Sequence, residues 1–186
     1  MARRLILLAL GFLSAGASTA VSQGKDIVGY YLAMPGDYFA CEAGVFTDSE
    51  TFRLQAIQHK NIKNGYLLAH IDHGMRYSIE VALFKDRLRG RDVIAVSIDC
   101  GAGCMCNEFK LLAFATDGSW QILDDLLPVR QMEQAMKKLE QEVGAEISAV
   151  YKLPEFGTTI RTLDSASGAL LYQLVWRNGA FHLQER

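Results

Sequence analysis

The chain has 186 residues, of which 50% are hydrophobic and 22% are charged. This composition excludes an intrinsically disordered protein and is sufficient for a sizeable core in one domain or two very small ones. With 19 Lys and Arg residues against 21 Asp and Glu residues, the net charge of −2 gives no general attraction to nucleic acid or to an anionic membrane.

The first twenty residues have the layout of a secretory signal peptide. Two arginines precede an apolar run over residues 5–13, and small residues then lead to a cleavage motif at residues 18–20. An uncleaved membrane anchor is the alternative, but the apolar run is well short of the ~20 residues that span a bilayer. We therefore expect a signal peptide over 1–20 and one exported domain over 21–186, periplasmic or extracellular, without a transmembrane segment.

The first part of this domain predicts one helix. Residues 26–41 are apolar and aromatic, but they show no period that assigns them to a helix or a strand. Further along, Thr47 and Glu50 have the spacing of a capping box, and apolar side chains follow at helical spacing. A helix is therefore expected over about residues 48–59.

Beyond Asn64 the apolar residues alternate with a period of two, which is typical of β-strands. Strands are predicted over residues 66–72, 77–85, 93–99, 108–116 and 119–123. The run 108–116 is apolar on both faces, which indicates a strand that is central or covered by a helix. Asp117 and Gly118 follow it and predict a two-residue hairpin turn in which both residues have positive φ.

The first hairpin of this region brings possible ligands together. If Ile71 pairs with Tyr77, four polar side chains share one face of the hairpin: His70, Asp72, Ser78 and Glu80. The two histidines, His70 and His73, and the carboxylates of Asp72 and Glu80 could bind a divalent cation. His70, Asp72 and His73 could also form a binding surface for a partner. The alternative is a solvated hairpin end. No third ligand at a diagnostic spacing supports a metal, and His73 in the turn is expected to point away from His70.

The next connection, residues 85–92, carries four cations in an acidic protein. Arg87, Arg89 and Arg91 could bind a carboxylate or an anionic partner, because a guanidinium presents a two-pronged donor. The alternative is the solvated tip of a hairpin, since the net charge of the chain does not favour an anionic partner.

Three cysteines lie close together in the loop after the third of these strands. Cys100, Cys104 and Cys106, with Cys41, make an even number, as expected of a disulfide-bonded exported domain. Pairing Cys104 with Cys106 would strain the bond. Two arrangements are left: Cys41–Cys106 with Cys100–Cys104, or Cys41–Cys104 with Cys100–Cys106. The alternative is a zinc or Cu(I) site formed by all four thiolates. A thiol–disulfide oxidoreductase is disfavoured because no Cys-x-x-Cys motif is present.

The C-terminal part predicts one helix and a second set of strands. Residues 130–143 form the clearest helical pattern, with Gly144 placed to end it and one apolar stripe: Met132, Met136, Leu139 and Val143. Strands follow over residues 147–153, 158–163, 169–177 and 180–184. Asn178 and Gly179 predict a type I′ turn between the last two.

Together these elements predict an α+β fold, a mostly antiparallel β-meander with one or two packed helices and a disulfide staple. A sub-division near residue 128 would separate a strand-rich part, 64–127, from a helix with strands, 129–186. No catalytic motif is found in the sequence. We therefore expect a non-enzymatic binding module without a cofactor, for an unknown protein or small ligand and not for nucleic acid. One alternative is a metal-binding protein that uses the cysteine loop. Another is a hydrolase whose site assembles from distant residues.

Overall fold

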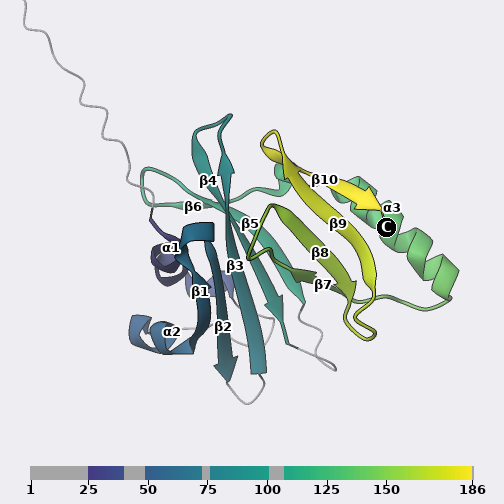
Figure 1. The fold of residues 1–186 in the computed structure, drawn as a ribbon, viewed down its shortest axis with the longest axis horizontal. Helices are drawn as coiled ribbons and strands as arrows, with labels where there is room; N and C mark the ends of the chain where they lie inside the picture. Colours follow the sequence, from purple (N-terminus) through teal and green to yellow (C-terminus); the bar gives the residue numbers. More distant parts are fainter. Residues whose placement is uncertain (1–24, 40–48, 73–75, 101–106, 186) are drawn as a thin grey trace, which may run out of the picture.

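The computed structural model describes residues 25–39, 49–72, 76–100 and 107–185. Within these ranges the chain forms two antiparallel sheets and three α-helices (Figure 1), in agreement with the expected α+β class. No helix in these ranges is long and apolar enough to span a membrane. The predicted signal peptide lies outside the described residues.

The first sheet is a six-stranded meander in which each strand pairs antiparallel with the next in sequence. Its strands are β1 (Ile57–Asn61), β2 (Tyr66–Asp72), β3 (Arg76–Asp86), β4 (Arg91–Asp99), β5 (Glu108–Phe114) and β6 (Trp120–Ile122). The register pairs Ile71 with Tyr77, as the sequence predicts. The sequence pattern does not indicate β1, because this edge strand is polar and mostly exposed.

Two short helices cover one face of this sheet: α1 (Ile27–Ala33) and α2 (Glu50–Ala56). The Asp26 side chain caps α1 by accepting a 2.7 Å hydrogen bond from the Gly29 N–H. Arg53 on α2 is buried, and its guanidinium donates to the backbone carbonyls at the end of α1: Tyr31, Leu32 and Met34. The arginine thereby fixes the two helices against each other, since it satisfies carbonyls that α1 leaves without an intrahelical partner.

The helix predicted over about residues 48–59 is confirmed as α2, but it is shorter than expected and has a different N-cap. The helix begins at Glu50, and its N-cap is Ser49, which accepts the N–H of Phe52 at 3.3 Å. Thr47, which the sequence suggests as the cap, lies outside the described residues. The helix ends at Ala56 because the chain enters β1 at once and pairs with β2.

The second sheet has four strands in the order β10-β9-β8-β7. They are β7 (Ala149–Lys152), β8 (Thr159–Asp164), β9 (Leu170–Arg177) and β10 (Ala180–Glu185), preceded by α3 (Val129–Val143). Three 3₁₀ turns complete the described elements: η1 (Gly36–Tyr38), η2 (Ile62–Asn64) and η3 (Asp124–Leu126). The α3 helix lies against β9 and β10 (Figure 1), and its buried residues belong to the same core as one face of the meander.

The apolar stripe of α3 differs from the prediction in one position. Met132, Met136 and Leu139 pack into the core as expected, but Val143 is 65% exposed and Ala135 takes the remaining core position. Gly144 ends the helix with φ +71°, a conformation that favours glycine. The 3.6-residue period therefore fixes the face of the helix, while its last turn projects beyond the sheet that it covers.

The two predicted glycine turns have different outcomes. Asn178 (φ +52°) and Gly179 (φ +75°) form the expected type I′ turn between the paired residues Arg177 and Ala180. At the other turn only Gly118 has positive φ, so the prediction for Asp117 is wrong. The Asp117 carboxylate accepts the N–H of Ser119 at 2.9 Å, and this local bond supports a wider turn.

The meander is the middle layer of the molecule. One face packs on α1 and α2, and the other packs on the four-stranded sheet and α3. β5 contributes Leu112 to the first core and Leu111 to the second, so its predicted coverage on both faces is confirmed. The same holds for β4, where Val93 and Ala95 are buried opposite Ile94 and Val96. In the central strands this two-sided burial leaves the hairpin ends as the accessible parts.

Candidate binding surface at the β3–β4 hairpin

The arginine-rich connection predicted from the sequence is the tip of the β3–β4 hairpin, and a buried carboxylate organises it. The side chain of Asp86 is fully buried. It accepts hydrogen bonds from Arg89 Nη1 at 3.0 Å, from the Arg89 N–H at 3.3 Å and from Arg91 Nε at 3.4 Å. Burial alone would raise the pKa of Asp86, but the hydrogen bonds and the charge of Arg89 outweigh it and hold the pKa low. An ionised aspartate therefore fixes two guanidinium groups in place.

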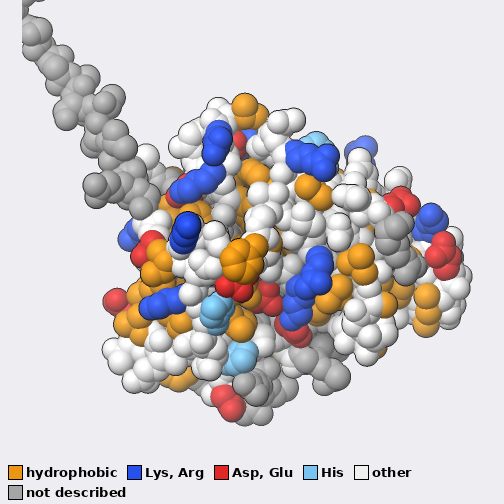
Figure 2. Space-filling view, in the orientation of Figure 1, with side chains coloured by type: hydrophobic (Ala, Val, Ile, Leu, Met, Phe, Trp, Pro, Cys, Tyr) orange, Lys and Arg blue, Asp and Glu red, His pale blue; other side chains and the backbone are white. Residues whose placement is uncertain are grey.

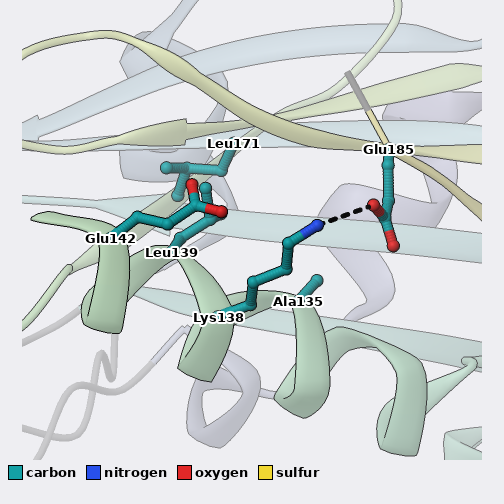
Figure 3. Close-up of a pocket in the computed structure, with 6 residues that line it drawn as sticks. All are labelled: Ala135, Lys138, Leu139, Glu142, Leu171 and Glu185. Atoms are coloured by element: carbon teal, nitrogen blue, oxygen red, sulfur yellow. Dashed lines mark ion pairs between the residues drawn. The ribbon is translucent and has the colours of Figure 1, made fainter.

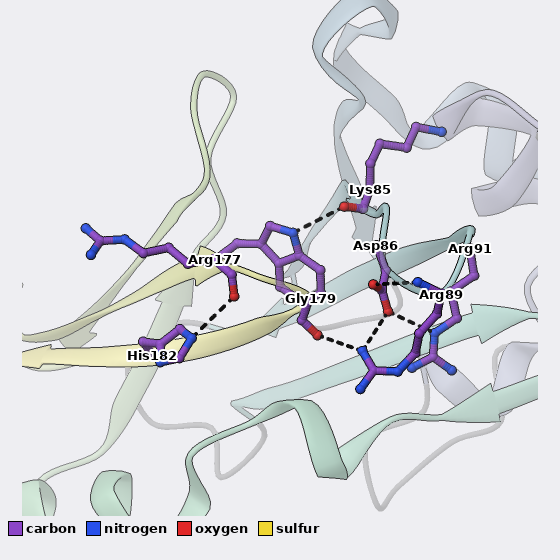
Figure 4. Close-up of polar contacts among 8 residues, drawn as sticks. Lys85, Asp86, Arg89, Arg91, Arg177, Gly179 and His182 are labelled. Carbon is purple, nitrogen blue, oxygen red and sulfur yellow. Dashed lines mark hydrogen bonds and ion pairs between the residues drawn. The ribbon is translucent and has the colours of Figure 1, made fainter.

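The β9–β10 turn supports this tip from the second sheet. Arg89 Nη1 also donates to the carbonyl of Gly179 at 3.2 Å, as Figure 4 shows. The indole Nε1 of Trp176 donates to the carbonyl of Lys85 at 3.4 Å. Gly179 lies so close that an added Cβ would stand 2.8 Å from Asp86 Oδ1 and 3.1 Å from Arg89 Nη1. The two hairpins are thus held together by hydrogen bonds from both sides.

Five cations lie on these two hairpin ends, and we call them the basic tip: Lys85, Arg87, Arg89, Arg91 and Arg177. The side chain of Arg177 points away from those of Arg89 and Arg91 (Figure 4). Lys85 pairs with Asp92 at 2.7 Å, and Asp86 pairs with Arg89 and Arg91. Arg87 and Arg177 are exposed, and neither enters an ion pair within the described part of the chain. In Figure 2, Lys and Arg side chains lie over both hairpin ends with hydrophobic surface between them. The basic tip thus has an excess of positive charge in a chain whose net charge is −2.

Two hollows flank the basic tip. One has a volume of about 470 Å³ and lies between the hairpin tip and the β9–β10 turn. The other, of about 490 Å³, lies on the side of α1 and β5, beside Tyr30 and Phe114. There the hydroxyl of Tyr30 donates to Asp92 at 2.9 Å, and burial together with that carboxylate raises the pKa of Tyr30 to about 12. Of these two hollows, the first is the one lined by Arg87 and Arg177, the cations of the basic tip without an ion pair among the described residues.

The second surface predicted from the sequence lies at the opposite end of β3. The register places His70 opposite Ser78 and Asp72 opposite Arg76. Arg76 is ten residues along β3 from Asp86. That spacing corresponds to roughly 33 Å. His73 lies outside the described residues, and no metal-holding group of three His, Cys, Asp or Glu side chains occurs among those described. The structure therefore does not bring the two predicted surfaces together.

Glu80, expected on a solvated face, is buried beneath the second sheet. Its carboxylate accepts the Leu153 N–H at 2.8 Å and lies 3.4 Å from Lys152 Nζ, which also bonds Asp99 at 3.0 Å. Burial raises the pKa of Glu80, and the neighbouring ammonium opposes this only in part. For Lys152, burial is outweighed by hydrogen bonds and charge from Asp99 and Glu80, and its pKa is raised. The cluster ties β3 and β4 to β7, which is a structural role.

The cysteine predictions fall mostly outside the described residues. Cys41, Cys104 and Cys106 are not described, and Cys100 directly follows β4. The pairing of the four cysteines, and the zinc or copper alternative for them, remain predictions.

A smaller hollow of about 210 Å³ lies between α3 and the C-terminal strands (Figure 3). Lys138 on the helix faces Glu185 on β10 at 3.6 Å, and both side chains are more than half exposed. An exposed pair of this kind contributes little to stability or binding. This hollow offers no group with distinctive chemistry.

Sequence reasoning found the arginines of the basic tip but missed the residues that complete it. The missed residues are Trp176, Arg177 and Gly179, which lie about 90 residues after the hairpin tip along the chain. The sequence predicts them only as a strand end and a turn. No local pattern connects them with Asp86. No protein-family model matches this chain, and no curated protein or solved structure has significant similarity to it.

Proposed function

We propose that this protein is an exported, non-enzymatic binding module whose basic tip recognises carboxylate groups of a partner. The observation that carries the proposal is the buried Asp86, which pairs with Arg89 and Arg91 at the hairpin tip and leaves Arg87 there, and Arg177 at the adjoining turn, as exposed cations without an ion pair in the described part of the chain. A guanidinium presents a two-pronged donor that matches the two oxygens of a carboxylate. Positive charge concentrated at one end of an acidic protein also orients an anionic partner as it approaches.

The export part of this proposal rests on the signal-like first twenty residues. In that setting the cysteines are expected to form two disulfides near the end of β4, far from the basic tip. Nucleic acid is a weaker candidate, because the net charge of the whole chain is negative.

Binding of a labelled acidic peptide tests the proposed function. The probe is a fluorescent pentapeptide, Asp-Glu-Ser-Glu-Asp with blocked ends, titrated with the protein and followed by fluorescence anisotropy. The affinity is expected to fall several-fold as NaCl rises from about 50 mM to about 300 mM, because exposed charges are screened over such distances. Replacing Arg87 and Arg177 by Glu is expected to weaken binding at least about tenfold.

A charge-matched variant provides the control. Lys60 on β1 and Lys137 on α3 are exposed, and replacing both by Glu changes the net charge equally without touching the basic tip. This variant should bind within about twofold of the wild type. Equal losses in both double variants would show a general charge effect and contradict the proposal. So would a single-stranded oligonucleotide that displaced the peptide more strongly than free glutamate-rich peptide does.

A further inference from the structure

The hollow of about 470 Å³ is a groove that opens directly beside the basic tip. Its floor consists of three apolar side chains, Leu83, Phe84 and Trp176, and Leu88 lines it at the hairpin tip. None of the residues described as lining the groove carries a carboxylate. Its volume is within the range of about 300–1,000 Å³ that ligand pockets occupy, so it can take one large side chain with part of its backbone.

The floor of the groove is held in a fixed shape. The ring of Trp176 packs against Phe84 at 5.7 Å and against Phe181 at 4.9 Å between centroids. Its Nε1 donates to the carbonyl of Lys85, so the indole cannot turn without losing that bond. A preformed apolar surface of this kind binds an incoming side chain without first having to order itself.

Cations form the rim of the same groove. Lys85, Arg87 and Arg177 line it, and all three are exposed. The charge of the rim therefore selects for negative groups directly next to whatever occupies the apolar floor.

One large apolar side chain that lines the groove is left exposed. Leu88, at the hairpin tip, is 73% exposed. An isolated apolar side chain on a surface is common, but one that adjoins an apolar groove extends the apolar surface that a partner can contact.

We infer that the groove binds an extended segment of a partner protein in which a large apolar side chain is flanked by Asp or Glu. The apolar side chain occupies the floor between Leu88 and Trp176, and the flanking carboxylates meet Arg87 and Arg177. This inference rests on the proposed function and adds the identity of the partner segment. An anionic membrane is the less suitable partner, because Phe84 is buried and Trp176 is half-buried, so neither can insert into a bilayer.

The test compares three peptides, of which the first two differ only at the central residue and the third keeps the central Phe without the flanking carboxylates. Asp-Glu-Phe-Glu-Asp, Asp-Glu-Ser-Glu-Asp and Ser-Ser-Phe-Ser-Ser, all with blocked ends, are titrated against the full protein. The first is expected to bind about tenfold tighter than the second, since the Phe ring becomes buried. A Trp120→Phe variant leaves Trp176 as the only tryptophan, and its emission is expected to shift with the first peptide and not with the second.

A blocking variant separates the groove from the charge. Thr158 is exposed, and the bond that it makes to the Trp176 N–H uses its backbone carbonyl. Thr158→Trp therefore fills the groove without removing a cation, and it should abolish the tenfold preference for Phe. Gln184→Trp, at an exposed position on β10, is the matched control and should retain it.

The outcomes distinguish this inference from the proposed function. Equal binding of both acidic peptides would overturn the inference and leave the carboxylate-binding function standing. Failure of every acidic peptide to bind would remove both. Co-sedimentation with vesicles of about 30% anionic lipid that is lost in Leu88→Ser, without any preference for Phe, would overturn the inference in favour of a membrane.

Discussion

Asp86 at the end of β3 and Gly179 in the β9–β10 turn are in such close contact that Gly179 has no room for a side chain. A Cβ atom there would stand 2.8 Å from Asp86 Oδ1, and the φ of Gly179 is +75°. The carboxylate cannot easily move away, because it accepts two hydrogen bonds from Arg89. The turn of one sheet is therefore fitted to the buried charge of the other.

Replacing Gly179 by Ala is expected to destabilise the protein by about 2–3 kcal/mol, from backbone strain and displacement of Asp86. Gly118→Ala is the matched control, because Gly118 has φ +85° and nothing within 4 Å of the added Cβ. Strain alone should cost about 1 kcal/mol there. Urea unfolding of both variants measures the difference, and equal losses would show that the contact with Asp86 has no energetic weight.

Asp86→Asn is expected to destabilise the protein and to weaken binding of the acidic peptide. The substitution leaves Arg89 and Arg91 beside a neutral group, and we expect a loss of about 2 kcal/mol at neutral pH, since both arginines are partly exposed. The folded-state pKa of Asp86 is lowered, because the arginines outweigh its burial. Its contribution is therefore present above about pH 4 and is lost as the pH falls through the folded-state value. Urea unfolding at several pH values should show the gap between wild type and variant closing in acid, whereas a pH-independent gap would contradict this.

Glu80 gives the opposite pH dependence. Its folded-state pKa is raised by burial, so the folded protein holds this proton more tightly than the unfolded chain does. The stability linked to that proton is complete below about pH 4 and is lost as the pH rises through the folded-state value. Relative to Glu80→Gln, the wild type should therefore lose stability between acidic and neutral pH. Thermal unfolding of both proteins across this range measures the trend, and parallel curves would show that burial does not shift the pKa of Glu80.

The cysteines can be tested by intact mass. If all four form disulfides, the denatured protein is about 4 Da lighter than its reduced form and takes up no alkylating reagent. Reduction should then destabilise it by roughly 4 kcal/mol, because a bond from Cys41 to the β4–β5 loop closes a loop of about sixty residues. Four alkylatable thiols in the denatured chain, with a native mass higher by one metal ion, would favour the metal-binding alternative.

The sequence alone determined most of the local structure. Alternating or continuous apolar runs located nine of the ten described strands, and a three-residue connection over 73–75 predicted the observed pairing of Ile71 with Tyr77. Asn178 and Gly179 form the expected turn, and Gly144 ends α3 as predicted. These features depend on period, turn chemistry and φ, which are properties of neighbouring residues. The polar edge strand β1 was missed because its pattern carries no apolar signal.

Only the tertiary structure decided how these elements pack and which polar groups meet. Burial of Glu80 depends on Leu153, 73 residues later, and the support of Arg89 depends on Gly179, 90 residues later. Such contacts form because each sheet must bury its apolar face against another element, and the side chains that then meet at the edges leave no local mark in the sequence. Arginines could therefore be identified as candidates from the sequence, whereas the groove beside them exists only because the β9–β10 turn folds back onto the β3–β4 hairpin.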